Sequence, residues 1–309
     1  MLSHSITPVL VPDEGFASLP AACERMHQEL GQPILTFACG ASADVRSRLS
    51  ALEASGQIQL LDSHISTLLT RAEMRNLAAE AATGNFILCA DPSVHLLRSD
   101  VERMVAGLEE RDGHFVSPML TRGDRVAFGG VQLRSTHKPN GELSRIKLFD
   151  VEQNALVSGI ASELVASDSV DFRCFIGRVS IVRELIHGWD VRMAGLEMFD
   201  FALRARFHKL RVFVDRRVRV NMHQRQTFDT HDRAFRAFCG ADPFRQLAED
   251  AFLFKWSAVA PEPMSVHRHR RRDIFLRRSL QTRIDDAIAR LARYQSPEPK
   301  SLWRDLMLG

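Results

Sequence analysis

The chain has 309 residues, of which 45% are hydrophobic and 26% charged, and its formal net charge is only +3. This composition is that of a globular protein with a sizeable core, and the charge balance gives no reason to expect nucleic acid as a partner. No apolar run reaches the ~20 residues that span a bilayer. The first sixteen residues lack a basic start, so we expect them to open the fold rather than to form a signal peptide. The five cysteines form no CxxC pair, which favours a reducing cytoplasm without a disulfide framework or a zinc site.

Strand-like and helix-like segments alternate along the first 120 residues. Apolar runs predict strands at 6–11, 34–38, 58–61, 86–90 and 115–120, and helical spacing predicts helices at 16–31, 45–52, 68–82 and 99–110. This alternation is typical of βαβ units. We therefore expect an α/β fold whose mostly parallel sheet is flanked by helices.

The pattern changes after residue 120. The turn at 138–141 predicts an antiparallel ribbon, followed by loops up to about residue 170. Regular structure then returns as a strand at 170–176, a helix at 178–187, and a helix with two short strands over 195–223. Helical patterns at 233–259 and 280–294 flank the breaker Pro-Glu-Pro at 261–263. We expect an α/β domain over 1–230 and a helical, basic extension over 231–309.

Acids and a histidine stand where predicted elements begin or end. Asp91 follows the strand at 86–90, Glu197 and Asp200 open the helix after 195, and His223 ends the last strand. Ligands of open α/β sheets bind outside the carboxyl ends of the strands, so these residues are candidates for a site. Each also has a purely structural interpretation, in which the acids cap a helix or close a turn and the histidine is a hydrogen-bonded core residue.

The order of these motifs resembles the family 2 glycosyltransferases of the GT-A type, over roughly residues 5–225. The resemblance is carried by the opening strand at 5–12, Arg75-Asn76, the strand leading to Asp91-Pro92-Ser93, the turn Gly188-Trp189-Asp190, the helix from Glu197 to Arg206, and the closing strand from Val218 to His223. It implies a GT-A-like, Rossmann-related sheet with the helical C-terminal part as an appendage. It also implies transfer of a sugar from a nucleoside-diphosphate sugar to a hydroxyl of a glycan, lipid or small molecule, with inversion, as in polysaccharide biosynthesis.

The same resemblance assigns roles to residues. Nucleotide-sugar contacts fall on Val11, Pro12, Arg75, Asn76, Asp91 and Ser93. Acceptor contacts fall on Trp189 and Asp190, and catalysis on Glu197, with Asp200 as the next candidate base. Mn²⁺ or Mg²⁺ would be held by Asp91 and His223.

Three positions depart from the family pattern. The acids expected after the second strand are replaced by Ala38-Cys39-Gly40, the second acid of the Asp-x-Asp motif is Ser93, and the second acid of the Glu-Asp pair is Met198. One alternative is therefore a catalytically degenerate relative that binds carbohydrate or assembles with a partner. Another is metal-independent transfer, in which Arg75, or with less support Arg204 or Arg206, grips the phosphates.

The basic run at 267–278 allows two interpretations. Its arginines could dock on an anionic membrane, and the protein would then be peripheral at the inner face of that membrane. They could instead dock on a charged glycan or lipid. The simpler interpretation, which we favour slightly, is a solvated face of a helical tail. Phe275 is the only aromatic residue in the run, which argues against nucleic acid.

Overall fold

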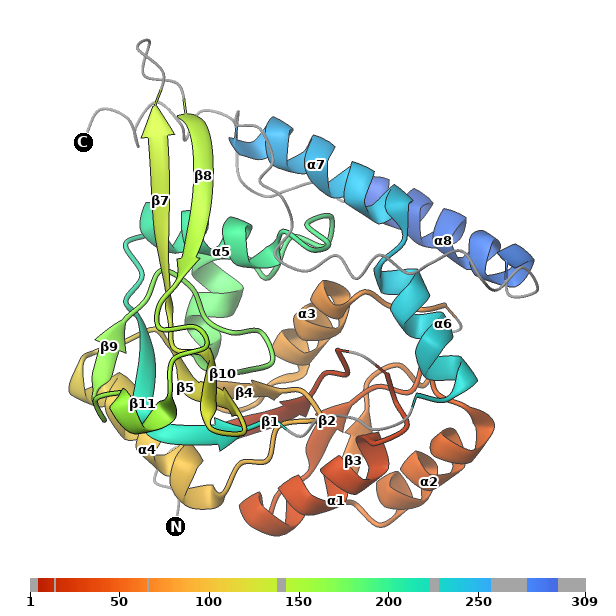
Figure 1. Cartoon of the computed structure of the whole chain (residues 1–309). Helices are drawn as coiled ribbons and strands as arrows, with labels where there is room; N and C mark the ends of the chain where they lie inside the picture. The colour runs from red at the N-terminus through yellow and green to blue at the C-terminus, as the bar shows by residue number, and fades with distance from the viewer. Residues whose placement is uncertain are drawn as a thin grey trace.

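The computed structural model describes residues 5–13, 15–65, 67–137, 143–222, 228–256 and 277–293. In this part of the chain a nine-stranded sheet has the order β3-β2-β1-β4-β10-β5-β11-β9, with β6 paired to β5 (Figure 1). The strands are β1 (Ile6–Leu10), β2 (Ile34–Thr36), β3 (Ile58–Leu60), β4 (Phe86–Ala90), β5 (Phe115–Arg122), β6 (Arg125–Phe128), β9 (Leu164–Ala166), β10 (Cys174–Arg178) and β11 (Val212–Asn221).

Helices connect and cover these strands. They are α1 (Leu19–Leu30), α2 (Ala43–Ala54), α3 (Arg71–Ala81), α4 (Arg98–Glu110), α5 (Glu197–Phe207), α6 (Thr230–Cys239), α7 (Asp242–Trp256) and α8 (Arg277–Ala292). A separate ribbon of β7 (Val131–His137) and β8 (Leu143–Asp150) rises from the sheet beside α5, and α7 and α8 lie side by side (Figure 1).

The predicted mostly parallel α/β sheet and the helical C-terminal part are confirmed. Strands β3, β2, β1 and β4 pair in parallel with one another, and β5 pairs in parallel with β11. Strand β10 runs antiparallel between β4 and β5, and the outer strands β6 and β9 are also antiparallel. The predicted ribbon is also confirmed, and its turn at 138–141 lies outside the described residues.

The elements differ most from the predictions after residue 170. The strand expected at 170–176 occupies Cys174–Arg178, and the expected helix at 178–187 is a π-helical turn at Ile181–Leu185. The two short strands expected after residue 211 form one strand, β11, whose pairing register with β5 shifts between Asp215 and Arg219. The expected helix at 233–259 is divided at Gly240 into α6 and α7.

The hydrophobic core falls into two clusters. The larger one fills the space around the sheet and includes Phe235 of α6 and Leu291 of α8, so helices near the C-terminal end share the core of the sheet. The smaller one joins the β7–β8 ribbon, α5 and α7 through side chains such as Leu133, Phe199 and Phe252. Helix α5 therefore packs against α7 on the side away from the sheet.

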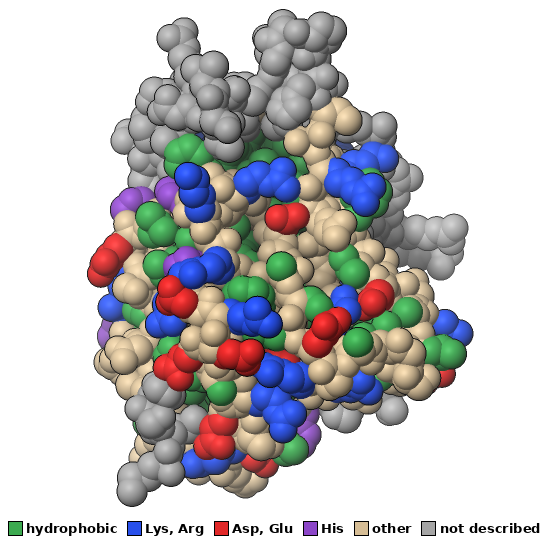
Figure 2. Space-filling model, turned by 90° about the vertical axis from the view of Figure 1, so that its left-hand side faces the viewer, with side chains coloured by type: hydrophobic (Ala, Val, Ile, Leu, Met, Phe, Trp, Pro, Cys, Tyr) green, Lys and Arg blue, Asp and Glu red, His purple; other side chains and the backbone are tan. Residues whose placement is uncertain are grey.

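On the face seen in Figure 2, basic and acidic side chains are interspersed rather than gathered by sign. Among the helices of the described residues, none combines the length and the apolar character needed to cross a bilayer.

Candidate functional site

The carboxyl ends of β1 and β4 meet, because the two strands pair in parallel with Leu10 opposite Ala90. Val11 continues this pairing by donating its N–H to the carbonyl of Ala90 at 2.9 Å, and Pro12 after it is buried. Asp91 is 4% exposed, and its carboxylate accepts the N–H of Asp13 and the N–H of Ser93, both at 2.8 Å. Asp91 thereby ties the loop after β1 to the loop after β4.

Asp13 and Glu197 approach each other through Arg71, the first residue of α3. Arg71 forms an ion pair with Asp13, and its Nη2 lies 3.9 Å from Oε1 of Glu197 at the start of α5. Burial alone would raise the pKa of Asp13, but the charge of Arg71 and its hydrogen bond outweigh burial and lower it. The side chains of Asp13 and Arg71 are about a quarter exposed and that of Glu197 is 14% exposed, so solvent reaches this cluster.

Arg75 lies one helical turn after Arg71 on the same face of α3, at the buried end of this cluster. It is only 3% exposed, and its guanidinium lies over the ring of Phe172, with 4.6 Å from Cζ to the centroid. Its Nη2 donates a long 3.4 Å hydrogen bond to the carbonyl of Phe172. Its Nε and Nη1 have no hydrogen-bond partner among the described residues. Burial lowers the pKa of Arg75, and the charge of Glu197 opposes that shift.

One more charged group, Arg173, borders the cluster, and another, Asp62, lies at the end of β3 in the same sheet. Arg173 forms a bidentate pair with Asp171, and this pairing, which outweighs burial, raises the pKa of Arg173. Asp62, just after β3, receives the N–H of Ala38 between its two oxygens at 2.9 and 2.8 Å, and burial raises its pKa. A carboxylate from β3 therefore reaches the place after β2 where the sequence itself has Ala38-Cys39-Gly40.

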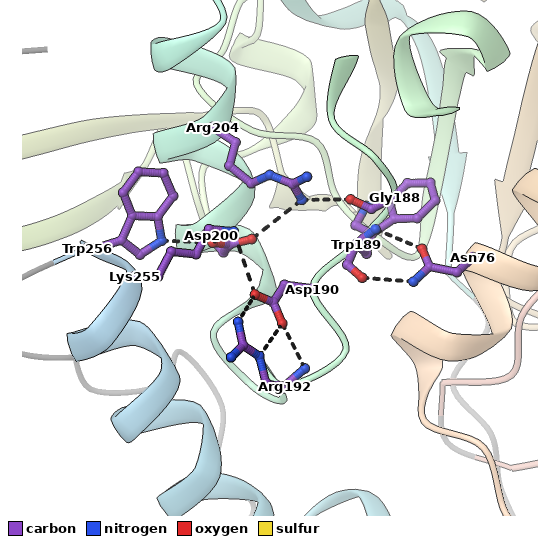
Figure 3. Close-up of polar contacts among 9 residues, drawn as sticks. All are labelled: Asn76, Gly188, Trp189, Asp190, Arg192, Asp200, Arg204, Lys255 and Trp256. Atoms are coloured by element: carbon purple, nitrogen blue, oxygen red, sulfur yellow. Dashed lines mark hydrogen bonds and ion pairs between the residues drawn. The ribbon is translucent and has the colours of Figure 1, made fainter. Parts of the chain in front are cut away.

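Asp200, the second predicted catalytic acid, belongs to a buried polar network with Arg204, Lys255 and Trp256 (Figure 3). It is 3% exposed, and its Oδ1 accepts the indole N–H of Trp256 at 2.8 Å and lies 3.0 Å from Nζ of Lys255. Its Oδ2 lies 3.6 Å from Arg204. These contacts hold α5 against α7. Of the two predicted catalytic acids, Glu197 is therefore the one that solvent reaches.

Asp190, predicted to contact an acceptor, belongs to the same buried network. It is 4% exposed and forms a bidentate pair with Arg192 at 3.0 and 2.8 Å, and Nζ of Lys255 lies 3.7 Å away (Figure 3). Lys255 thus bridges Asp190 and Asp200. The bridge fixes both ends of the loop that leads into Glu197.

Asn76 and Trp189, predicted to contact nucleotide and acceptor, bind each other. The amide oxygen of Asn76 accepts the N–H of Trp189 at 2.7 Å, and its amide nitrogen donates to the Trp189 carbonyl at 2.8 Å (Figure 3). The indole of Trp189 is 2% exposed and packs on Phe175 with ring centroids 5.8 Å apart. In this structure the pair joins α3 to the loop before α5.

The described residues around Asp91 form no cluster of carboxylates, histidines and cysteines that could hold a divalent metal ion by itself. Both oxygens of Asp91 accept backbone N–H groups, and Ser93 is neutral. Among the described residues, no three side chains of His, Cys, Asp or Glu gather so that they could hold a metal. His223, the other predicted ligand, lies outside the described residues. The orphaned polar atoms next to this place belong to the guanidinium of Arg75, which suits an anion.

Sequence reasoning missed Asp13, Arg71, Asp62 and Lys255. Three of them carry a local signal, because Asp13 follows a predicted strand and Arg71 precedes Arg75 by one helical turn. Asp62 likewise follows the predicted strand at 58–61. Lys255 carries none, since its partners lie more than fifty residues earlier in the chain.

No protein-family model and no curated protein matches the sequence. The fold, in contrast, is similar to those of solved glycosyltransferases. GalNAc-T7, solved with UDP, GalNAc and Mn²⁺, is 11% identical with a TM-score of 0.52, and the match covers 81% of this chain and 50% of that chain. The mannosyltransferase PcManGT from Pyrobaculum calidifontis, solved with GDP-Man and Mn²⁺, is 11% identical with a TM-score of 0.50, and the match covers 98% of this chain and 78% of that chain.

The chain thus spans about half the length of the first of these structures. At this level of identity the similarity concerns the fold alone. The chain has an α/β fold of the GT-A glycosyltransferase type.

Proposed function

We propose that the protein is a family 2-like glycosyltransferase that moves a sugar from a nucleoside-diphosphate sugar to a hydroxyl group of a glycan, lipid or small molecule. The observation that carries this proposal is the cluster of Asp13, Arg71, Arg75 and Glu197 at the carboxyl ends of β1 and β4, in a GT-A-like fold. It combines a partly exposed carboxylate with an unpaired buried cation.

Glu197 is the proposed general base. In the transfer, the acceptor oxygen bonds to the anomeric carbon, the bond from that carbon to the diphosphate breaks, and the acceptor proton passes to the carboxylate of Glu197. A single displacement of this kind inverts the anomeric centre. Glu197 is suited to the role because Met198 cannot take a proton and because Asp200 is held by Lys255 and Trp256.

The first experiment is a thermal-shift panel of UDP, GDP, CDP and dTDP sugars, each measured with Mn²⁺ and with EDTA. A donor at about 100 times its dissociation constant stabilises the folded state by about 2.7 kcal/mol. We expect a shift with one nucleotide class, followed by slow release of its diphosphate when acceptors are added. If no donor shifts the midpoint at millimolar concentration, the proposal is wrong.

The acceptor and the cellular location are further proposals. A cytoplasmic protein with a glycan or lipid-linked acceptor agrees with the sequence. The proposed contact between 267–278 and an anionic membrane falls almost wholly outside the described residues. Flotation of the full chain with vesicles that contain anionic lipid tests this contact, and binding that does not depend on anionic lipid would contradict it.

A further inference from the structure

We propose that Arg75, together with Arg71, binds the diphosphate of the donor and supplies the counter-charge that a divalent ion would otherwise provide. This inference rests on the proposed function, and it adds that donor binding needs no metal.

The first step is the state of Arg75. A buried guanidinium normally uses its donors in ion pairs or hydrogen bonds, because an unpaired buried charge is costly. Arg75 is 3% exposed, yet its Nε and Nη1 are unpaired among the described residues and its one hydrogen bond is 3.4 Å long. A fold keeps such a group at a cost, and a bound anion would remove that cost.

The second step is that the neighbouring acids are already engaged. Asp13 is paired with Arg71, Asp171 with Arg173, and Asp91 with two backbone N–H groups. Glu197 lies 3.9 Å from Arg71 and acts on Arg75 through its charge, with no hydrogen bond to the Arg75 guanidinium among the described residues. The positive charge of Arg75 is therefore the one in this cluster that lacks a close partner among the described residues.

The third step is the shape of the ligand. Arg71 and Arg75 are four residues apart on α3, which places their side chains side by side. Arg71 is about a quarter exposed and Arg75 is buried, so the pair extends from the surface inward. Nε and Nη1 of Arg75 are without partners among the described residues, and Arg71 keeps donors besides the Nη1 that pairs with Asp13, so the two guanidiniums can together bind the oxygens of a diphosphate. A nucleoside diphosphate and inorganic pyrophosphate share this diphosphate chemistry, and pyrophosphate lacks the nucleoside.

The test is calorimetric titration of the full chain with inorganic pyrophosphate in EDTA, compared with UDP and GDP under the same conditions. The variants are Arg75→Met, Arg75→Lys and the control Arg103→Met, which removes an exposed arginine of α4. We expect wild type and Arg103→Met to bind pyrophosphate without metal. We expect Arg75→Lys to bind about 10-fold more weakly, because the fork is lost, and Arg75→Met to bind at least ~100-fold more weakly.

A stability measurement separates ligand binding from folding. If Arg75 is kept for an anion, Arg75→Met should melt at the same temperature as wild type or higher in the absence of ligand, since it removes an unpaired buried charge. A large drop in its melting temperature would instead mean that Arg75 supports the fold through Phe172, and the inference would be overturned. If Arg75→Met does not fold at all, wild-type affinity of Arg75→Lys for pyrophosphate would overturn it equally.

The outcomes also separate this inference from the proposed function. Pyrophosphate binding in EDTA that is lost in Arg75→Met supports the diphosphate site even if no nucleotide sugar binds, a result that would reject only the glycosyltransferase. Nucleotide sugars that bind solely with Mn²⁺, with no pyrophosphate binding in EDTA, would keep the glycosyltransferase and overturn the arginine site.

Discussion

At the scale of single residues, Glu197 and Asp200 show how one helical turn separates two acids into different roles. Glu197 is partly exposed and near Arg71, whereas Asp200 is buried against Lys255 and Trp256.

We expect Glu197→Gln to lower kcat by ~10²–10⁴-fold, the usual contribution of a general base, with donor binding and melting temperature close to wild type. Steady-state kinetics and thermal denaturation check this, with Glu80→Gln on the exposed side of α3 as the control. Unchanged kcat would remove Glu197 from the mechanism.

Asp190 makes the free energy of unfolding depend on pH in the acidic range. Burial by itself would raise its pKa, but the hydrogen bond and charge of Arg192 and the charge of Lys255 outweigh burial and lower it below the usual 3.8. An acid with a lowered folded-state pKa stabilises the fold above the unfolded-state value and loses that contribution as the pH falls through the folded-state value. The stability gap between wild type and Asp190→Asn should therefore shrink as the pH falls below about 3.8. Urea denaturation from about pH 5 to about pH 2.5 measures the gap, and a constant gap would refute the assignment.

At the scale of elements, α5 and α7 are held together by the Lys255–Asp200 ion pair, the Trp256–Asp200 hydrogen bond and the apolar cluster around them. Lys255 lies 3.0 Å from Asp200, and both side chains are at most 5% exposed. We expect Asp200→Asn or Lys255→Met alone to cost about 3 kcal/mol, because either removes the closest partner of a buried charge and leaves it the longer contact, 3.7 Å to Asp190 for Lys255 or 3.6 Å to Arg204 for Asp200. The double variant should cost less than the sum, with a coupling energy of about 1–3 kcal/mol.

A double-mutant cycle by chemical denaturation gives this coupling energy. The control is a second cycle on Arg245 and Glu249, an exposed pair along α7 itself, where the coupling should be below about 0.5 kcal/mol. Equal coupling in the two cycles would mean that Lys255 and Asp200 do not hold the helices together.

At the scale of the whole molecule, α8 is attached to the start of α3, the helix that carries Arg71 and Arg75. Arg290 pairs with both oxygens of Glu73 at 2.7 and 3.1 Å and donates to the carbonyl of Leu68. Arg290→Ala should speed amide hydrogen exchange in α8 and in the first turn of α3 by a few-fold, an effect of roughly 1 kcal/mol because its side chain is 35% exposed. Exchange in β1 and β4 should not change. Arg283→Ala, which removes an exposed arginine of α8, is the control, and an equal effect of the two variants would refute this attachment.

Most of the fold could be predicted from the sequence, because local periodicity decides whether a segment forms a strand or a helix. The first four strands and the helices between them follow their apolar patterns. The errors arise where long-range contacts decide. The apolar run of β11 continues through Asp215 and Arg216 because these polar residues are buried and paired, with Arg217 and Glu152 respectively.

The candidate site was less predictable for the same reason. The sequence places Glu197 and Asp200 at the start of a helix but does not say which of them α7 buries. That outcome depends on Lys255 and Trp256, far along the chain. Asn76 was predicted to contact a nucleotide, and only the structure reveals that its amide is bonded to the backbone of Trp189.

The position of β10 in the sheet has a consequence for how the chain folds as it is synthesised. Strand β10 lies between β4 and β5, although it follows both in sequence. Until Cys174–Arg178 leaves the ribosome, β4 therefore presents an unpaired apolar edge, and the two halves of the sheet stay unconnected. Unpaired edges favour pairing with other chains, so nascent chains that end before β10 are the ones most exposed to aggregation and most dependent on chaperones.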